Sequence, residues 1–590
     1  MSAGAIKIEA FNYGDVQLLD SMFKTRFDVN RNYLLSLDND SLLYPYRFEA
    51  ALPHWEYHGP ESLTRPGKPY GGWEHPTCSL RGHFLGHFLS ACARIYATTG
   101  DREIKNKADS IVMELARCQQ QNGNGYVGPI PEKFFDILES GKMGQIWAPY
   151  YVIHKVLMGL YEMYKFAGNR LAFQIMKGMV DYIRRRVEKI PDEWMQKILN
   201  VEFGGMPEVL YDFYAEVGDP QYLSLAQKFE HKRILDPLAK NQDVLTKVHG
   251  NTTIPKIHGA ARAYEITGIQ KYRDIAVNFW EIIARTRTYA TGGSTVGEVW
   301  GEPHKLKDTL SEWNQETCVT YNWMRLCRYL LRWTGDAKYG DMYERALFNG
   351  ILAAQNPADG MFIYFLPLKT GSKKRFGTPT DSFWCCYGTG VQAFADLASS
   401  IYFHDDDNIY VNLFIPSEVR WSHSGAIIRV RQENNYPEES ATHLTIQLSE
   451  EPVYFGLKIR VPWWVKKGIN IKVNGENVEV KAAPSTFVEL RREWKNKDVV
   501  DVIMPMSLYA EPINDDENLV AIMYGPLVMA GLTSEEVVFR GDKNNLESWI
   551  ELIPGEPLAF KTRGQEKDIK FIPLCKVVSE EYGVYFRISS

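Results

Sequence analysis

A short pattern that ends one helix and starts the next recurs through the first 335 residues. It consists of an aromatic residue, three further residues, a glycine and, in most copies, Asp or Asn. The copies are Tyr96–Asp101, Tyr164–Asn169, Tyr214–Asp219, Tyr264–Gly268 and, with Leu in place of the aromatic residue, Leu331–Asp336. Glycine tolerates the left-handed conformation that closes a helix, and Asp or Asn caps the helix that follows. Each copy therefore predicts the tight turn of an antiparallel helix pair.

The glycines of this pattern lie 50 to 68 residues apart, which indicates a repeat architecture of helix pairs. We expect a sixth pair to end near residues 394–402, where Ile401–His404 takes the place of the glycine turn. An open solenoid and a closed toroid both satisfy such a repeat. The closed (α/α)6 barrel is favoured, because the loops between the hairpins carry clusters of polar residues.

The chain changes character after residue 405, where short segments rich in branched and aromatic residues replace the helical pattern. The expected strands are Asn408–Phe414, Ala426–Arg431, His443–Leu448, Leu457–Val461, Phe487–Leu490 and Val499–Met504. Residues 469–480 predict a hairpin with an Asn474-Gly475 turn. This spacing is typical of one or two β-sandwiches, and Ile6–Glu9 is expected to add a strand to them.

The predicted fold is therefore a mainly α catalytic (α/α)6 barrel followed by all-β sandwich domains. The expected division is an N-terminal lead-in at residues 1–20, the barrel at 21–404 and the β-sandwich module or modules at 405–590.

The composition excludes several function classes. With 67 basic and 73 acidic residues the net charge is −6, so there is no electrostatic footprint for nucleic acid. No segment reaches the roughly 20 apolar residues of a membrane span. Residues 1–9 lack a secretory signal pattern, and 8 cysteines in 590 residues are too few for a disulfide scaffold. We expect a cytoplasmic protein with reduced thiols and no membrane partner.

Two short clusters hold the residues best suited to bind a metal. Cys385 and Cys386 are adjacent, and Glu316-Thr317-Cys318 lies upstream of them. Three sulfurs and a carboxylate make a complete donor set for tetrahedral Zn²⁺. Free cysteines are also common in protein cores, and neither pair has the frequent Cys-x₂-Cys spacing. From spacing alone, a zinc site and a set of buried core cysteines remain open.

A glycine-rich loop between the fourth and fifth turns, residues 291–304, carries two carboxylates. Glu298, close to Trp300 in the sequence, is the candidate general acid, with a pKa raised by apolar burial. Glu302 precedes a proline and is the weaker candidate. The alternative for Glu298 is a solvated surface glutamate.

Several histidines could line a polar cavity. His83 and His87 share one helix face, but Gly82 and Gly86 beside them indicate close helix packing rather than a metal site. His154 and His249 also lie near expected helices, where a lone histidine is more often structural than catalytic. The aromatic content, 15 Trp, 33 Tyr and 28 Phe, favours a carbohydrate ligand without requiring one.

A combination of motifs in one order is similar to a known family. It comprises residues 72–74, 80–84, 292–298, 316–322, 343–350 and 383–386. Together they resemble the β-L-arabinofuranosidases of glycoside hydrolase families 127 and 146, over about residues 72–402. The resemblance implies an (α/α)6 barrel with β-sandwich modules, in agreement with the repeat pattern.

The resemblance also implies residue roles. Glu316, Cys318, Cys385 and Cys386 match the family's zinc ligands, with Cys385 also its nucleophile and Glu298 its acid/base. His249, Glu344 and Tyr364 match residues that contact the sugar, and His154 and His83 are expected to join them. Residues 203–208 have no histidine where some family members carry further substrate-binding ones.

The predicted function is thus a retaining exo-glycoside hydrolase that releases L-arabinose from β-L-arabinofuranosides of plant cell-wall glycans, with Zn²⁺ as cofactor. Its partner is an oligosaccharide or glycoside, and a homodimer is possible. Three alternatives stay open: a hydrolase of another pectic sugar, a non-catalytic carbohydrate-binding protein with structural zinc, and a lyase or epimerase that acts on uronic acids.

Overall fold

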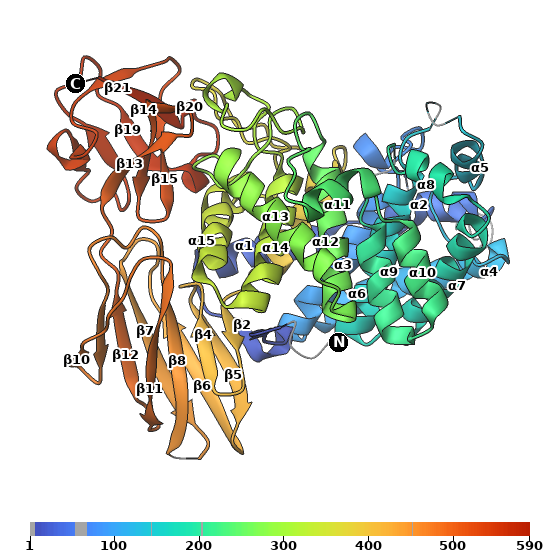
Figure 1. Ribbon diagram of the computed structural model, residues 1–590, viewed down its shortest axis with the longest axis horizontal. Helices are drawn as coiled ribbons and strands as arrows, with labels where there is room; N and C mark the ends of the chain where they lie inside the picture. The colour runs from blue at the N-terminus through green and yellow to red at the C-terminus, as the bar shows by residue number, and fades with distance from the viewer. Residues whose placement is uncertain are drawn as a thin grey trace, which may run out of the picture.

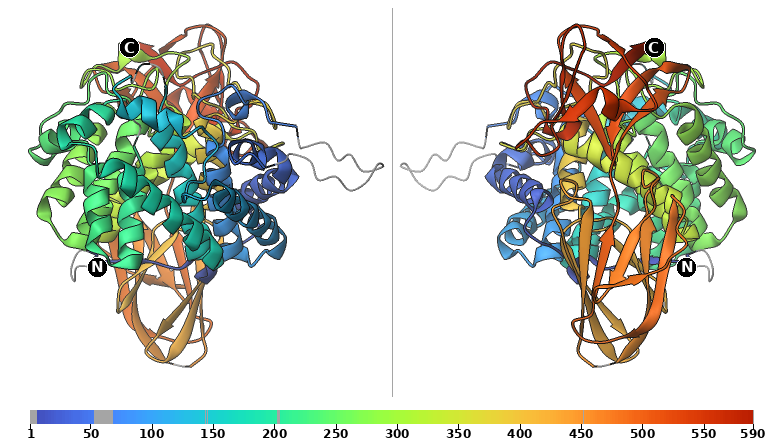
Figure 2. Two further views of the ribbon diagram at one scale, coloured as in Figure 1. Left: turned by 90° about the vertical axis from the view of Figure 1, so that its right-hand side faces the viewer. Right: turned by 90° about the vertical axis from the view of Figure 1, so that its left-hand side faces the viewer.

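The structure is a computed structural model that describes residues 6–52, 68–142, 144, 146–201, 204–450 and 452–589. A helical domain occupies one side of the molecule, and two β-rich units lie on the other side (Figure 1). Figure 2 shows these two β units one above the other, with the helices beside them. The predicted fold class, a helical barrel followed by β domains, is confirmed.

Five helix hairpins follow one another in the described part of the chain. They are α3 (His83–Thr99) with α4 (Arg102–Asn122), α6 (Pro149–Ala167) with α7 (Arg170–Val187), α9 (Met206–Val217) with α10 (Pro220–Lys228), α12 (Gly250–Thr267) with α13 (Gln270–Thr286), and α14 (Thr317–Thr334) with α15 (Ala337–Ala346).

The recurring glycine makes each of these turns, as the sequence predicts. Gly100, Gly168, Gly218, Gly268 and Gly335 each end a helix with a left-handed φ between +64° and +77°. In four of the five turns the next residue accepts a hydrogen bond from the first turn of the following helix through its side chain. The turn chemistry that defines the repeat is therefore the one expected from the sequence.

The first helices of the hairpins form a closed ring, so the toroid and not the solenoid is present. A sixth inner helix, α17 (Cys385–Ala395), packs against both α14 and α3 and completes the circle. Contact is closest between α3 and α6: a Cβ atom built on Gly86 would lie 2.0 Å from the backbone oxygen of Lys155. Gly86 is therefore a close-packing glycine, as its sequence context indicates.

The prediction of a sixth hairpin is correct for its inner helix, α17, but wrong for its outer helix. The partner of α17 is α1 (Met22–Ser36), from the other end of the chain, and Asn30 Nδ2 on α1 donates to Val391 O on α17 at 2.9 Å. Tyr402–His404, where the turn was expected, form strand β3. The chain leaves the barrel after Ala395 because no glycine-capped turn follows it.

Shorter helices fill the connections. They are α2 (Asn39–Glu49), α5 (Lys133–Glu139), α8 (Asp192–Ile198), α11 (Lys232–Ala239), a π-helix at Leu347–Ile351 and α16 (Leu352–Ala354). Among the residues described, no helix is long and apolar enough to cross a membrane.

Two sheets form the β unit drawn in orange in Figure 1. The five-stranded sheet has the order β1 (Glu9–Ala10), β3 (Tyr402–His404), β4 (Asn408–Val411), β8 (Val453–Val461) and β11 (Thr486–Trp494). The seven-stranded sheet has the order β10 (Glu476–Val478), β9 (Asn470–Val473), β12 (Val499–Ile503), β7 (Ala441–Leu448), β6 (Ala426–Glu433), β5 (Ser417–His423) and β2 (Val16–Leu18).

The two sheets pack face to face as a sandwich. Side chains alternate between buried and less buried along β5 and β6, and Trp421 on β5 meets Phe455 on β8 with ring centroids 6.0 Å apart. Asn474 and Gly475 both have positive φ, as the predicted two-residue hairpin between β9 and β10 requires.

The N-terminal segment contributes an edge strand to each sheet of the sandwich. β1 pairs with β3 and β2 pairs with β5, both antiparallel. The expected N-terminal strand at Ile6–Glu9 is therefore present but begins three residues later, and a second strand accompanies it. These pairings and the α1–α17 contact tie the start of the chain to its middle.

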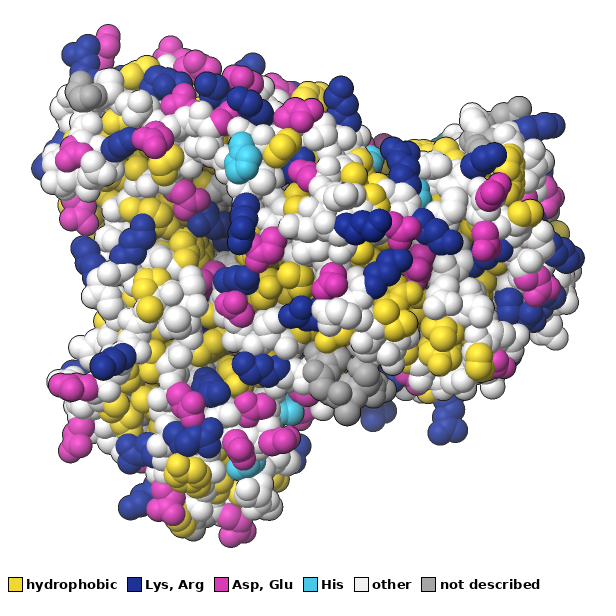
Figure 3. Space-filling view, viewed as in Figure 1, with side chains coloured by type: hydrophobic (Ala, Val, Ile, Leu, Met, Phe, Trp, Pro, Cys, Tyr) yellow, Lys and Arg dark blue, Asp and Glu magenta, His cyan; other side chains and the backbone are white. Residues whose placement is uncertain are grey.

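The C-terminal β unit contains the nine-stranded sheet. Its order is β16 (Val538–Arg540), β21 (Tyr585–Ser589), β14 (Asp516–Tyr524), β15 (Leu527–Leu532), β19 (Lys570–Pro573), β18 (Phe560–Thr562) and β17 (Ile550–Leu552), with β13 (Leu508–Ile513) beside β14 and β20 (Tyr582–Gly583) beside β15. On the face of the molecule in Figure 3, Lys and Arg are interspersed with Asp and Glu rather than gathered by sign.

Candidate active site

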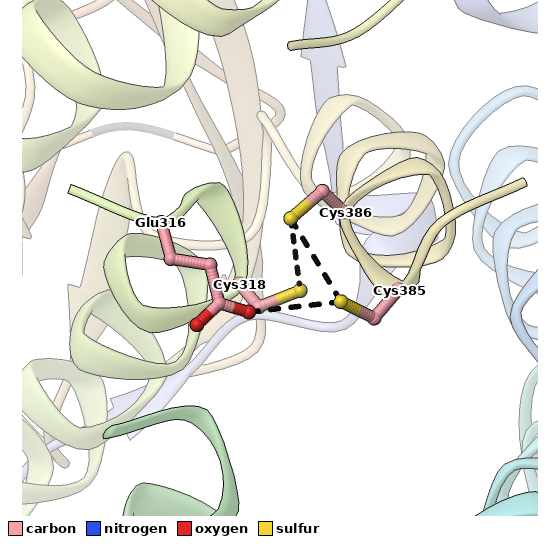
Figure 4. A group of neighbouring side chains, drawn as sticks. All are labelled: Glu316, Cys318, Cys385 and Cys386. Atoms are coloured by element: carbon pink, nitrogen blue, oxygen red, sulfur yellow. Dashed lines mark hydrogen bonds between the residues drawn. The ribbon is translucent and has the colours of Figure 1, made fainter. Parts of the chain in front are cut away.

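Two inner helices begin at the same place and bring together the residues of the predicted metal cluster. Glu316 is the N-cap of α14 and Cys318 lies in its first turn, while Cys385 and Cys386 are the first two residues of α17. Figure 4 shows the four side chains converging from these two helix ends. The partial positive charge of a helix N-terminus favours thiolate and carboxylate groups there.

The spacing of the four donors fits a tetrahedral metal ion. Cys318 Sγ lies 3.4 Å from Cys386 Sγ, Cys385 Sγ lies 3.9 Å from Cys386 Sγ, and Cys385 Sγ lies 3.6 Å from Glu316 Oε1. Bond lengths of about 2.3 Å to sulfur and about 2.0 Å to oxygen give edges of roughly 3.8 Å and 3.5 Å in a tetrahedron around Zn²⁺. All four donor atoms lie within 4.8 Å of one another.

The electrostatics of the cluster also favour a cation. All four residues are buried, and burial raises the pKa of the Glu316 carboxyl and of the Cys318 thiol. Glu316 Oε2 is buried without a hydrogen-bond partner among the residues described. Since buried polar atoms are normally satisfied, the orphaned oxygen together with three adjacent thiols fits a divalent metal better than a plain apolar core.

Glu298 faces this cluster from the loop between α13 and α14. Its φ is +69°, an unfavourable value for a residue with a Cβ atom. Two backbone hydrogen bonds of 2.8 Å hold the loop, from Gly297 N to Trp313 O and from Gly250 N to Glu298 O. The strained conformation is therefore fixed by its neighbours and aims the carboxylate inward.

The Glu298 carboxylate has partners on both oxygens. His249, the N-cap of α12, accepts from Thr252 N through Nδ1, and its Nε2 lies 3.3 Å from Glu298 Oε2. The Tyr364 hydroxyl donates to Glu298 Oε1. The hydrogen bond from His249, followed by that from Tyr364, lowers the pKa of Glu298.

The prediction that Trp300 raises the pKa of Glu298 is wrong. Trp300 is fully buried, donates from Nε1 to Ser294 Oγ at 2.9 Å and does not line the pocket that Glu298 lines. The pKa of Glu298 falls instead of rising because hydrogen bonds to the charged form outweigh partial burial. The weaker candidate, Glu302, accepts from Thr246 Oγ1 and does not line the pocket described next.

A pocket of about 90 Å³ lies between the cluster and Glu298. It is lined by Trp73, Leu80, Trp147, Tyr151, His249, Asn251, Thr252, Glu298, Glu316, Tyr364 and Cys385. This volume is well below the roughly 300–1,000 Å³ of pockets that hold drug-sized ligands, so the pocket suits a single small ring rather than several. It therefore brings Cys385, Glu298, Glu316, His249 and Tyr364 of the predicted site together.

The Glu344 side chain lies outside this pocket, where the helical domain meets the sandwich. It is fully buried on α15, 3.0 Å from Arg460 Nη2 on β8. Tyr436 Oη and Trp464 Nε1 each donate to its carboxylate at 3.1 Å. In this structure its carboxylate links α15 to the sandwich, and it is not among the residues that line the pocket.

Two predicted histidines also lie apart from the pocket lining. His154 on α6 lines another cavity, of about 510 Å³, together with charged residues such as Glu208 and Arg325. His83 lies behind the residues that line the pocket: its ring centroid is 5.8 Å from those of two of them, Trp73 and Tyr151. Its Nδ1 bonds to Leu80 O at 2.9 Å, and its buried Nε2 has no partner in the described structure.

Several lining residues were missed or left ambiguous by sequence reasoning. Trp147 and Tyr151 flank the start of α6, and Asn251 and Thr252 lie in the first turn of α12. The pocket is thus built at the N-terminal ends of inner helices. The signal that could have found them is position: residues at or just before the starts of the inner helices α6, α12, α14 and α17 line the same pocket.

Comparisons with known proteins agree with this fold and identify a family. The family profile described as the β-L-arabinofuranosidase GH127 catalytic domain matches residues 15–399, and that of the GH127 middle domain matches residues 408–506. A non-reducing end β-L-arabinofuranosidase of Bifidobacterium longum subsp. longum is 25% identical over 525 residues, which cover 77% of this chain and 75% of that protein.

Solved structures give the same fold over the whole chain. A GH127 β-L-arabinofuranosidase from Geobacillus stearothermophilus T6 superposes with a TM-score of 0.76 at 19% identity, and covers 97% of this chain and 100% of its own. A second GH127 β-arabinofuranosidase has a TM-score of 0.78 at 19% identity, and covers 99% of this chain and 98% of its own.

Proposed function

Because this chain belongs to the GH127 family and is a glycoside hydrolase, we propose that it releases L-arabinose from the non-reducing end of β-L-arabinofuranosides with retention of configuration. One observation carries the proposal. The Tyr364 hydroxyl bonds to Glu298 and also lies 3.6 Å from Cys385 Sγ, which brings a carboxylate and a sulfur to the same small pocket. A pocket for one ring favours exo action.

We further propose that Glu316, Cys318, Cys385 and Cys386 hold Zn²⁺. Three sulfur donors select zinc over the hard cations Mg²⁺ and Ca²⁺, which prefer oxygen. Zinc bound by these residues would keep the Cys385 sulfur deprotonated and fixed in place, although a free thiol is largely protonated at neutral pH. Glu316 lines the pocket together with Cys385, whereas Cys318 and Cys386 do not line it and serve to position the metal and the Cys385 sulfur.

In the first step, Cys385 Sγ attacks the anomeric carbon while the bond from that carbon to the glycosidic oxygen breaks. The Glu298 carboxyl gives its proton to that oxygen, which leaves as an alcohol. In the second step, the Glu298 carboxylate takes a proton from water, whose oxygen attacks the same carbon and displaces the sulfur. Two inversions give net retention.

The environment of Glu298 sets its two protonation states. Without substrate, the hydrogen bonds from His249 and Tyr364 favour the carboxylate. A sugar in the pocket excludes water, and this desolvation favours the acid form. The same two residues then stabilise the carboxylate once the proton has left, so they act in both steps.

The test is turnover of a chromogenic β-L-arabinofuranoside by the purified protein under reducing conditions, with the anomer of the first-formed product followed by NMR. We expect β-L-arabinose first, with mutarotation afterwards. Cys385→Ala and Glu298→Gln should each lose activity, and Cys78→Ala, a half-buried cysteine outside the cluster, should keep it. Full activity of Cys385→Ala would overturn the sulfur nucleophile, and α-product would overturn retention.

A protein that binds zinc and the sugar but cleaves no β-L-arabinofuranoside would favour the binding-protein alternative instead. Cleavage of another pectic sugar but not of arabinofuranosides would leave the proposed chemistry of the site unchanged and would revise only the proposed substrate. Metal content measured on the same preparation distinguishes both results from inactivity caused by loss of zinc.

A further inference from the structure

A second pocket, of about 360 Å³, adjoins the catalytic pocket and has no part in the chemistry described above. Aromatic rings make most of its wall, with charged groups among them: Trp313, Tyr364, Phe365, Trp384, Lys373 and Arg375. Tyr364 belongs to both pockets, and its ring centroid lies 5.8 Å from that of Trp384. Tyr364, which touches the proposed reacting groups, therefore forms part of the wall of both pockets.

Trp313 is the most unusual residue of this second pocket. Its side chain is 56% exposed, although large aromatic residues are normally covered. Phe365 packs against it edge-on, with ring centroids 5.6 Å apart, and so holds the indole in place. A fixed, exposed ring beside a catalytic pocket is a surface on which a sugar ring can stack.

The position of Trp313 places it on the side where the leaving group departs. Its backbone oxygen accepts a hydrogen bond of 2.8 Å from Gly297 N, and Gly297 directly precedes Glu298. Because the proposed acid/base gives its proton to the leaving oxygen, the rest of the substrate extends from the Glu298 side of the pocket. Trp313 is held against the loop that carries Glu298 and so lies on that side.

The charges in this pocket are balanced. Arg375 Nη2 lies 3.0 Å from Glu312 Oε2, and Lys373 Nζ lies 3.8 Å from Glu581 Oε1. Both pairs are exposed to solvent. Because exposed ion pairs are weak, their donors and acceptors stay available to the hydroxyl groups of a sugar. A neutral polyhydroxylated ring suits this surface better than an acidic one, since each cation already has a carboxylate beside it.

We propose that this second pocket is the subsite for the leaving-group sugar, a neutral ring that stacks on Trp313 and hydrogen-bonds to the Arg375–Glu312 pair. The inference rests on the proposed hydrolase function and deepens it: a leaving group that carries a neutral sugar ring is bound better than one without a ring. Trp313 is a specificity-determining residue that does not touch the reacting atoms.

The experiment compares two substrates with the same non-reducing residue. Methyl β-L-arabinofuranoside has no second ring, and a β-L-arabinofuranosyl disaccharide has a neutral one. For Trp313→Ala we expect the KM for the disaccharide to rise about tenfold, with kcat and all constants for the methyl glycoside changed less than about twofold. Trp313→Phe keeps a ring and should recover most of the loss. Tyr454→Ala, a similarly exposed aromatic residue on β8, is the matched control.

The outcomes separate the subsite from the function. Turnover of both substrates with equal effects of Trp313→Ala overturns the subsite alone. No turnover of either by the wild-type protein overturns the proposed function and the inference with it. A disaccharide with a uronic acid as its second ring tests the neutral preference: a kcat/KM more than about tenfold above that of the neutral one overturns it.

Discussion

The Tyr364 hydroxyl donates a hydrogen bond to the Glu298 carboxylate and lies 3.6 Å from Cys385 Sγ. A single side chain thus connects the proposed acid/base to the proposed nucleophile, although the three residues come from separate segments of the chain. Tyr364 is also the wall between the catalytic pocket and the adjoining aromatic pocket. Its hydroxyl therefore affects the chemistry, and its ring affects where each sugar lies.

Replacing Tyr364 with Phe removes that donor and keeps the ring. We expect kcat to fall about 10- to 100-fold, because a positioned hydrogen bond to the reacting groups is lost. The bond from Tyr364 holds the pKa of Glu298 down, so its removal raises that pKa. Since Glu298 must be protonated in the first step, the high-pH limb of the kcat/KM profile should move to higher pH.

The control for this variant is Tyr33→Phe, which removes a hydroxyl that bonds to Pro379 O away from the pocket. Its pH profile should match the wild-type one. A Tyr364→Phe profile whose high-pH limb stayed in place or moved to lower pH would contradict the assignment of Glu298 as the acid.

Removing the metal should destabilise the protein as well as inactivate it. The four donors join the first turns of α14 and α17, and without a cation three thiols and a carboxyl remain buried together. A ligand that binds only the folded state stabilises it by RT ln(1 + [L]/Kd), about 4 kcal/mol at a thousandfold excess over Kd. Incubation with a chelator under reducing conditions should lower Tm by several degrees, and added Zn²⁺ should restore it.

Glu316→Ala provides the matched comparison for metal removal, because it takes one donor from the cluster. Its Tm should start lower than that of the wild type and respond less to the chelator. A wild-type Tm that is the same with and without chelator, in a protein shown to contain zinc, would contradict a structural contribution from the metal.

Local signals predicted most of the helical domain and the metal cluster. The turn at Gly218 needs a left-handed residue, and the sequence supplies glycine there and at each equivalent turn. The cluster was also visible, because Glu316 and Cys318, like Cys385 and Cys386, lie within one helical turn of each other. Such features depend on residues that are close in sequence, so turn chemistry and side-chain type suffice to predict them.

Contacts between distant segments were not predictable in the same way. The outer partner of α17 is α1, more than 300 residues away, and no local pattern records that pairing. Glu344 has an ordinary helical context, and only the folded structure reveals that Arg460 lies opposite it. The pKa of Glu298 was predicted from its sequence neighbour Trp300, whereas His249 and Tyr364 set it through space.

Glu344→Gln tests the anchoring role of this residue. Arg460 is fully buried and pairs with both Asp341 and Glu344, so loss of one carboxylate charge leaves it partly uncompensated. Breaking a buried pair costs about 3–5 kcal/mol, and the remaining bond to Asp341 favours the lower value. We expect a fall of about 3 kcal/mol in the free energy of unfolding, with KM and kcat of the folded enzyme unchanged.

Asp28→Asn is the control for Glu344→Gln, because the Lys24–Asp28 pair lies on one helix, is only partly buried and should contribute less than about 1 kcal/mol. An increase in KM without loss of stability would return Glu344 to a role in sugar binding. Denaturant unfolding and steady-state kinetics on the same preparations distinguish the two.

Lys374 should make stability depend on pH above neutrality. It is buried between the helical domain and the C-terminal β unit, where Nζ donates to Leu574 O at 2.8 Å and to Val577 O at 2.7 Å. Burial lowers its pKa to about 7, from 10.5 in its ordinary state. Between these two values the unfolded chain binds the proton and the folded protein does not, so stability rises with pH.

Other groups titrate in the same range, so the measured quantity is the difference in unfolding free energy between wild type and Lys374→Met. Methionine has a similar length but no charge, and its loss of the two carbonyl contacts adds an offset that is independent of pH. From pH 7 to pH 9 the difference should change in favour of the wild type by up to about 2.7 kcal/mol, since each unit corresponds to about 1.36 kcal/mol. Lys177→Met, at an exposed helical position, should show no such trend. A flat difference for Lys374→Met would mean that the amine stays charged in the folded protein through hydrogen bonding to the two carbonyl oxygens.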